Sequence, residues 1–216
     1  TESFPPLDFS FSVLRNHVSL DTYRKVGFDK GKIFIISRKK VDQEQINKIP
    51  DIQENPIVVI YLSSIYSIEC IRSCIDILNQ NQMVDSVWIK PHPRTDPSSL
   101  HNLEGANIVF EQPSWSHVAL VGNSSIVIEL LETGVPVFQY FALDPIQHDY
   151  YGFVESKVTM SITSRDLLTP FWSKNFFDAN WVDRFSKYSP GINYLDTDQI
   201  TKLQEVVSNS FEDQIF

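Results

Sequence analysis

A histidine between two prolines is the first feature of this sequence that suggests chemistry. The segment Lys90-Pro91-His92-Pro93-Arg94 ends an apolar run, SVWIK, that is typical of a buried strand. Because prolines stiffen a turn, the imidazole of His92 would keep a fixed direction, suited to donating to a phosphate oxygen or a leaving group. Lys90 and Arg94 would add positive charge. The alternative is a proline-rich loop with a surface histidine.

A second candidate site follows the apolar run HVALVG. It comprises Gly122, Asn123, Ser124 and Ser125, which enter an expected helix that Gly134 closes. Such a turn exposes helix N–H groups, and these groups and the two hydroxyls could hold a phosphate at the positive end of the helix dipole. The alternative is ordinary capping, because serine starts many helices and glycine ends many.

The same expected helix carries a carboxylate that could serve the same ligand. Ser125, Glu129 and Glu132 are spaced four and three residues apart, which places them on one helical face. That face could present a hydroxyl near a phosphate and the Glu129 carboxylate near ribose hydroxyls.

The elements that would position these residues alternate between strands and helices. Strands are predicted in PIVVIYLSS, SVWIKPHP, ANIVFEQP, HVALVG and VPVFQYF, and helices in SIECIRSCIDILNQ and SSIVIELLETG. This alternation predicts an α/β fold, a Rossmann-like doubly wound parallel sheet whose ligands bind beyond the carboxyl ends of the strands. His92 and the serine turn both follow strands, so we expect them at the same edge of the sheet.

Composition divides the chain into three predicted parts. Residues 1–45 form a lead-in segment, a linker or the edge of an N-terminal domain, with a short strand from Ile33 to Ile36. Residues 46–145 form the Rossmann-like domain. Residues 146–216 form an aromatic-rich helical extension packed on that domain, with a final helix from about Asp196, where Gln199 completes capping-box spacing. We expect the aromatic side chains of this extension to be buried against a surface; they are Tyr150, Tyr151, Phe153, Phe171, Trp172, Phe176, Phe177, Trp181, Phe185 and Tyr188.

Charge and composition exclude several classes of function. With 216 residues, 42% hydrophobic and 21% charged, and no apolar run long enough to span a bilayer, the sequence favours a soluble globular domain. A net charge of -9 is a poor basis for nucleic-acid binding, and no signal peptide is visible. Cys70 and Cys74 lack further metal ligands nearby, so we expect two core thiols and no metal site.

The two candidate sites together resemble a known family pattern. KPHPR followed by GNSSIVIELLETGVPVF is similar to the sugar-donor half of bacterial GT-B glycosyltransferases, above all the capsular Kdo transferases and bacterial sialyltransferases, which use CMP-sugars. The resemblance extends over residues 26–141. It implies that His92 contacts the nucleotide phosphate and assists the departure of CMP, and that Ser124 and Ser125 bind phosphate.

The resemblance implies metal-independent transfer of a sugar, from a donor such as CMP-Kdo or CMP-sialic acid to a bacterial surface glycan, with no cofactor. It also implies a second Rossmann domain for the acceptor, so this chain alone is expected to be inactive. The expected location is the cytoplasm, at the inner face of the membrane, with peripheral attachment through other parts of the native protein. Asp144 and Asp149 lack a local pattern that would mark a catalytic base.

Two other functions remain open at this stage. Related motifs occur in phosphotransferases that use CDP-glycerol or CDP-ribitol in teichoic-acid or capsule synthesis, and in UDP-GlcNAc 2-epimerases. The aromatic C-terminal part could instead belong to a non-catalytic module that binds a glycan or a partner. Affinity for CMP, CDP or UDP that depends on His92 and Ser125 would separate the catalytic functions from the module.

Overall fold

The computed structural model describes residues 11–14, 16–25, 32–35, 41–47, 49, 52–100, 103–173, 176–178, 180–189, 201–202 and 204–205. The chain divides into two compact units, one formed by Thr1–Asp42 with Asp183–Phe216 and the other by Gln43–Val182. The start of the final helix that we predict near Asp196 lies outside the described residues, although residues 201–202 and 204–205 are helical.

The larger unit is built on one parallel sheet of six strands in the order β5-β4-β3-β6-β7-β8. The strands are β3 (Ile57–Tyr61), β4 (Ser86–Lys90), β5 (Asn107–Ile108), β6 (Val118–Val121), β7 (Val137–Gln139) and β8 (Met160–Ser161). Five of them lie where the apolar runs predict strands. The sixth, β8, was not predicted, because it is only two residues long and carries no apolar run. The predicted α/β doubly wound sheet is confirmed.

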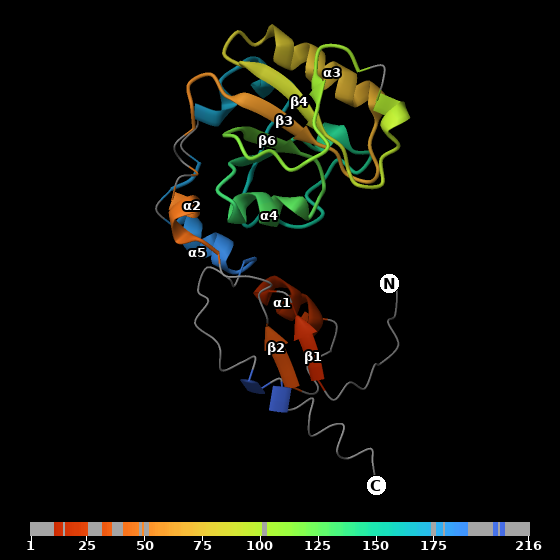
Figure 1. Cartoon of the computed structure of the whole chain (residues 1–216). Coiled ribbons are helices and arrows are strands. Elements are labelled where there is room, and N and C mark those ends of the chain that lie inside the picture. The colour runs from red at the N-terminus through yellow and green to blue at the C-terminus, as the bar shows by residue number, and fades with distance from the viewer. Residues whose placement is uncertain are drawn as a thin grey trace. The chain divides into compact units, whose positions relative to one another are not determined.

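Helices cover both faces of this sheet. The helix α3 (Ile68–Gln80) connects β3 to β4, and α4 (Ile126–Glu132) connects β6 to β7. Figure 1 shows α3 on one face and α4 on the other, as expected when right-handed crossovers run in opposite directions from the middle of a sheet. The short helix α2 (Gln43–Asn47) packs near α4.

Local sequence explains the ends of both crossover helices. The hydroxyl of Ser67 accepts a hydrogen bond from the backbone N–H of Cys70 and caps α3. Gly134 ends α4 with a φ of 81°, a left-handed conformation that glycine adopts without strain, and Val135 N donates to Leu130 O as in a Schellman motif. Gly134 therefore closes the helix as predicted.

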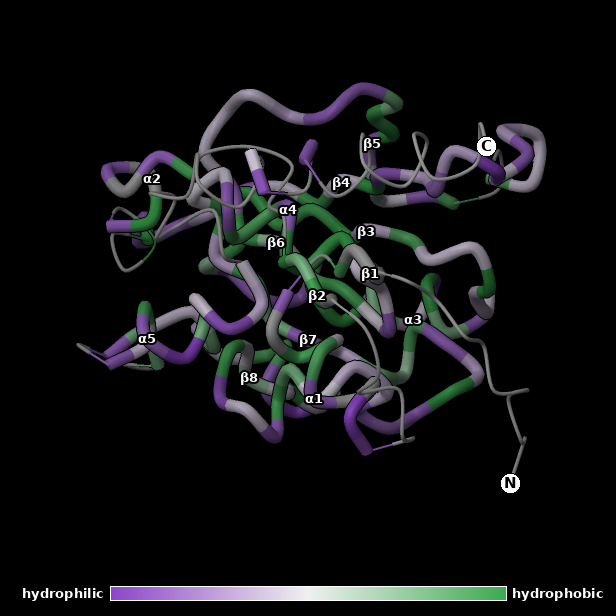
Figure 2. The backbone as a smooth tube through the Cα atoms, turned by 90° about the horizontal axis from the view of Figure 1, so that it is seen from below, coloured by the Kyte–Doolittle hydropathy of each residue, from purple (hydrophilic) through white to green (hydrophobic). Residues whose placement is uncertain are grey.

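The hydrophobic core lies on both faces of the central strands. All four residues of β6 are fully buried, as are Val58, Val59 and Ile60 of β3. Figure 2 colours these central strands mainly as hydrophobic. A strand covered on both faces has a continuous run of apolar residues. For this reason β3 and β6 could be predicted from the sequence.

Aromatic side chains from the expected extension cover the β7 side of the sheet. The ring of Phe138 on β7 lies 5.2 Å from that of Phe171 and 6.1 Å from that of Phe177, both edge-on. Phe171 belongs to the 3-10 helix η4 (Phe171–Ser173); the other 3-10 helices of the described residues are η1 (Pro97–Leu100), η2 (Phe141–Leu143) and η3 (Asp166–Leu168). The indole N–H of Trp181 donates to the backbone oxygen of Val158. These rings are buried by the sheet of their own unit.

The smaller unit contains a strand-helix-strand motif. Strands β1 (Phe11–Leu14) and β2 (Lys32–Ile35) pair in parallel, and α1 (His17–Lys25) connects them. Asn16 caps α1 by accepting from the backbone N–H of Ser19 at 2.8 Å. Only β2 was anticipated, within the predicted strand at Ile33 to Ile36. In the sequence, the helix α5 (Trp181–Ser186) includes the boundary between the two units, which lies between Val182 and Asp183.

Among the described residues, no helix combines the length and hydropathy of a membrane span.

Candidate functional site

The candidate residues follow the carboxyl ends of neighbouring strands in the large sheet, at matching distances along the chain. Three neighbouring strands end at positions paired across the sheet: Lys90, Tyr61 and Val121. Two residues further along each chain segment lie His92, Ser63 and Asn123. With strands about 4.8 Å apart, the last residues of β4 and β6, Lys90 and Val121, should be roughly 10 Å apart across β3.

This edge contains the switch point of the sheet. After β3 the chain adds β4 and β5 on one side, and then adds β6, β7 and β8 on the other. In open α/β sheets the crevice for a ligand lies where the direction of winding reverses, outside the carboxyl ends of the strands. Here the reversal lies between β3 and β6, so Ser63 and Asn123 flank it.

The turn at His92 fixes both the ring and its tautomer. The backbone N–H of Arg94 donates to Nδ1 of His92 at 3.1 Å. In the neutral ring Nδ1 is then an acceptor, so the ring proton is on Nε2. The ring is half-buried. His92 therefore carries an Nε2–H donor just beyond the carboxyl end of β4.

The two basic residues of this turn differ in exposure. Arg94 is exposed, whereas Lys90 is half-buried and its ammonium donates to the backbone oxygen of Pro91 at 3.3 Å. Burial lowers the pKa of Lys90 below its ordinary value. The predicted positive charge near His92 therefore comes from one exposed guanidinium and one partly desolvated ammonium.

The two serines of the turn, Ser124 and Ser125, differ in their hydrogen bonds. Ser124 Oγ accepts from the backbone N–H of Ile126 at 3.3 Å, which is the capping role we offered as the alternative. Ser125 is exposed and its side chain makes no capping hydrogen bond. Glu129, one turn later, is also exposed, as predicted for residues on one face. Capping therefore does not account for Ser125.

Hydrogen bonds hold both Gly122 and Asn123, a buried one at Gly122 and two exposed ones at the Asn123 side chain. Gln139, at the end of β7, donates to the backbone oxygen of Gly122 at 3.3 Å. The side-chain amide of Asn123 donates to the backbone oxygen of Ile146 at 2.6 Å and accepts from the N–H of Tyr150 at 3.1 Å. The Asn123 side chain therefore anchors the 146–150 loop, and its predicted phosphate contact would have to come from elsewhere in the residue.

Asp144, which the sequence analysis set aside because it has no local pattern, also lies at this edge of the sheet. It is only 5% exposed; Oδ2 accepts from the backbone N–H of Asn123, and Oδ1 accepts from the hydroxyl of Ser63 at 2.7 Å. Burial raises the pKa of the Asp144 carboxyl above its ordinary value, and its hydrogen bonds offset this only in part. Sequence offered no signal, because Asp144 reaches the turn from the loop after β7.

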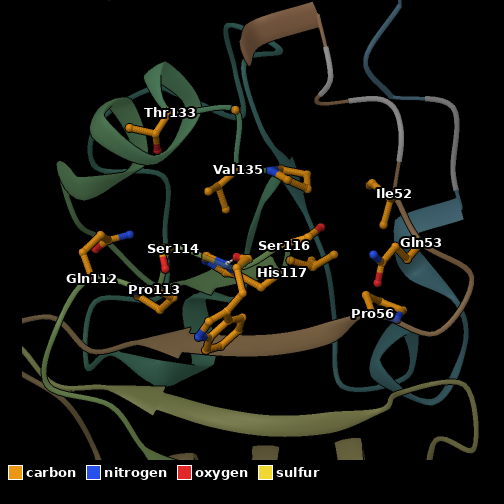
Figure 3. A pocket seen from close by; sticks show the side chains of 14 residues that line it. Ile52, Gln53, Pro56, Gln112, Pro113, Ser114, Ser116, His117, Thr133 and Val135 are labelled. Atoms are coloured by element: carbon orange, nitrogen blue, oxygen red, sulfur yellow. Dashed lines mark hydrogen bonds between the residues drawn. The ribbon is translucent and has the colours of Figure 1, made fainter.

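A pocket of about 650 Å³ lies at the opposite edge of the sheet (Figure 3). It is lined by residues that precede the strands, among them Pro56 before β3, His117 before β6 and Pro136 before β7. His117 is buried: its Nδ1 lies 2.8 Å from Trp115 O and its Nε2 lies 2.9 Å from the hydroxyl of Tyr61. None of the predicted site residues lines this pocket.

Within the part of the chain that is described, no group of three or more His, Cys, Asp or Glu side chains could hold a metal ion. Cys74 is buried, as we expect of a core thiol, and Cys70 is half-buried.

Comparison with solved structures finds similar chains at low sequence identity. CalG4, the calicheamicin glycosyltransferase, matches 92% of this chain and 52% of its own at 15% identity, with a TM-score of 0.51. The pneumococcal O-GlcNAc transferase GtfA, solved with UDP and GlcNAc, matches 93% of this chain and 45% of its own at 11% identity, with a TM-score of 0.49.

The likeness to CalG4 is one of fold, and it agrees with the Rossmann-like α/β sheet described above. This chain spans about half the length of CalG4. No protein-family model and no curated protein matches the chain.

Proposed function

We propose that this chain is the sugar-donor half of a GT-B glycosyltransferase that transfers a sugar from a nucleotide to a bacterial surface glycan. The observation that carries the proposal is the arrangement at the switch point, where His92 and the serine turn stand on either side of the end of β3. A nucleotide phosphate between them would meet an Nε2–H donor on one side and the exposed Ser125 hydroxyl on the other.

The residues have separate roles in this proposal. Ser125 and the neighbouring backbone N–H groups bind the phosphate, and the exposed Glu129 carboxylate accepts from ribose hydroxyls. His92 donates to the phosphate that leaves with the nucleotide, while Arg94 and Lys90 offset its charge. These groups are hydrogen-bond donors and cations of the chain itself, so the proposed transfer needs no metal ion.

The proposal also covers the substrates, the missing domain and the cellular location. The motif resemblance favours a CMP-sugar donor, a glycan acceptor, a second Rossmann domain and action at the inner face of the cytoplasmic membrane. The alternative, a phosphotransferase that uses CDP-glycerol or CDP-ribitol, would use the same phosphate site. A comparison of CMP, CDP and UDP as ligands separates these substrates.

The test is a calorimetric titration of the chain with each nucleotide. Replacement of Ser125 by alanine should weaken binding by roughly 1 to 3 kcal/mol, the scale of a lost hydrogen bond to a charged group. Ser114→Ala is the matched control, because Ser114 is equally exposed but lies at the opposite edge. Unchanged affinity in Ser125→Ala would remove the serine turn as the phosphate site.

A further inference from the structure

The pocket at the amino edge of the large sheet has no part in the proposed function. Its volume is about 650 Å³, which is within the range of small-molecule sites in proteins. Parts of three segments line it: residues 52–56 before β3, residues 112–118 leading into β6 and residues 133–136 before β7. All three segments belong to the larger unit.

The lining of this pocket is uncharged. The described residues that line it include no lysine, arginine, aspartate or glutamate. Among them only His117 titrates near neutral pH, and burial lowers the pKa of its ring. A phosphate or carboxylate group would find no cation in this lining to offset its charge. The chemistry of the pocket therefore favours an uncharged ligand.

The pocket has an aromatic ring that its neighbours hold in place. The ring centroids of Trp115 and Trp88 lie 5.4 Å apart, and those of Trp115 and His117 lie 5.1 Å apart. Trp115 is half-buried and lines the pocket, so part of its indole remains open to a ligand. Because the neighbouring rings already restrict the indole, a ligand that packs on it costs little side-chain entropy.

A chain of hydrogen bonds orients the polar groups beside this ring. Nδ1 of His117 lies 2.8 Å from the backbone oxygen of Trp115, which can only accept, so the neutral ring carries its proton on Nδ1. Nε2 then accepts from the hydroxyl of Tyr61 at 2.9 Å, and that hydroxyl accepts from the side-chain amide of Gln112 at 2.9 Å. The amide of Gln112 is thereby oriented, and its carbonyl oxygen remains an acceptor.

Further uncharged polar groups surround the pocket. Gln53, Ser114 and Ser116 are exposed, and no side-chain hydrogen bond joins them to another of the described residues. Figure 3 shows Gln53 and Gln112 on opposite sides of the pocket. A ligand here would therefore meet donors and acceptors on more than one side.

We propose that this pocket binds an uncharged sugar unit. A sugar ring has a face of C–H groups that can pack on an aromatic ring, and its hydroxyls each donate and accept hydrogen bonds. The indole of Trp115 provides the surface for the C–H face, and the side chains of Gln53, Gln112 and Ser116 provide partners for the hydroxyls. This binding goes beyond the proposed function and does not depend on it, because the pocket lies at the edge of the sheet opposite His92.

The test is an NMR titration of the chain with neutral sugars. The probes are the methyl glycosides of glucose, galactose, mannose and N-acetylglucosamine, with cellobiose and maltose, each at up to about 50 mM so that a Kd in the millimolar range is detected. At least one sugar should shift the indole N–H of Trp115 and the backbone N–H of Ser116 until both saturate. CMP should leave both signals in place, because the lining offers its phosphate no cation. Trp115→Phe identifies the indole signal among those of the four tryptophans.

Two substitutions test whether the sugar occupies this pocket. Gln53→Ala should weaken the affinity by about threefold to tenfold, the effect of one lost hydrogen bond between neutral groups. Trp115→Phe keeps an aromatic ring beside Trp88 but removes ring area and the indole N–H, so it should weaken the affinity at least as much. Gln82→Ala is the matched control and should bind as the parent does, because Gln82 is also an exposed glutamine but does not line the pocket.

Three results would overturn the proposal. The first is that none of the sugars shifts the Trp115 signal. The second is that a sugar binds with the same affinity to the parent, Gln53→Ala and Trp115→Phe, which would place it elsewhere on the chain. The third is that uridine, an uncharged nucleoside that can also stack on an indole, binds this pocket more tightly than every sugar. None of these results changes the outcome of the nucleotide titration of Ser125→Ala, so a failure here is distinct from a failure of the proposed function.

Discussion

The tautomer of His92 is set by a single backbone hydrogen bond. Because Arg94 N donates to Nδ1, the neutral ring carries its proton on Nε2, and the position of the turn puts that proton at the edge where a phosphate would leave. A fixed donor of this kind stabilises charge that develops as a leaving group departs, more than it strengthens binding of the ground state.

His92→Ala should therefore lower turnover more than it weakens nucleotide binding. The variant is compared with the parent in the complete enzyme that contains this chain, with a natural sugar donor and one that carries a better leaving group. The activated donor should recover part of the lost rate. Equal losses on both sugar donors, or a change confined to affinity, would make His92 a binding residue only.

The sequence pointed to some residues of the site and not to others. The positions of His92 and Ser125 at this edge could be predicted, because each follows a strand in a short motif, whereas their role in binding a phosphate stays a prediction. Asp144 could not be predicted: its contacts reach Ser63 and Asn123 across the sheet, and no local spacing encodes them. The use of the Asn123 side chain as an anchor for the 146–150 loop is likewise a tertiary contact.

At the scale of elements, the length of a strand and the burial of its two faces decided whether the strand could be predicted from the sequence. The strands β3 and β6 are apolar throughout because both faces are covered, and such runs stand out in a sequence. The pairing of β8 involves two residues, Met160 and Ser161, and depends on β7 beside it. The strand-helix-strand motif of β1, α1 and β2 was missed because α1 is mostly polar.

The turn after β6 has a tight backbone contact that can be tested by a double-mutant cycle. A Cβ atom on Gly122 would lie 2.1 Å from Oδ2 of Asp144 and 2.6 Å from its Cγ. Gly122→Ala should therefore lower the free energy of unfolding by about 1 to 3 kcal/mol, measured in urea. In the Asp144→Ala background the same substitution should cost less, because the clashing group is gone.

The coupling energy between these two positions should fall within about 0.5 to 3 kcal/mol. Gly105→Ala serves as the comparison: its Cβ would meet Asn79 rather than Asp144, so its cost should be the same in both backgrounds. Strict additivity for Gly122 and Asp144 would mean that the turn relaxes away from the carboxyl.

At the scale of the whole molecule, the described residues form a six-stranded doubly wound sheet and a separate two-stranded parallel sheet, and the chain spans about half of CalG4. On the proposed function, the six-stranded sheet binds the sugar donor, while the acceptor and its catalytic base need a further domain. The chain alone should therefore bind nucleotide but transfer no sugar. The test is an assay of the isolated chain with a radiolabelled sugar donor and an acceptor, and a labelled transfer product would contradict the prediction. Hydrolysis of the sugar donor would not contradict it, because hydrolysis needs only one half of the cleft.

The order of the strands also has a consequence for synthesis on the ribosome. β3 and β4 are synthesised before β6 and can pair, but the second edge of β3 stays open until β6 has been made and docks against it. During that interval the chain presents IVVIY, an uncharged β-branched segment of the kind that nucleates intermolecular strands. Chains that stop before Val118 should therefore aggregate, and a chaperone that shields the open edge of β3 should improve the yield of the complete protein.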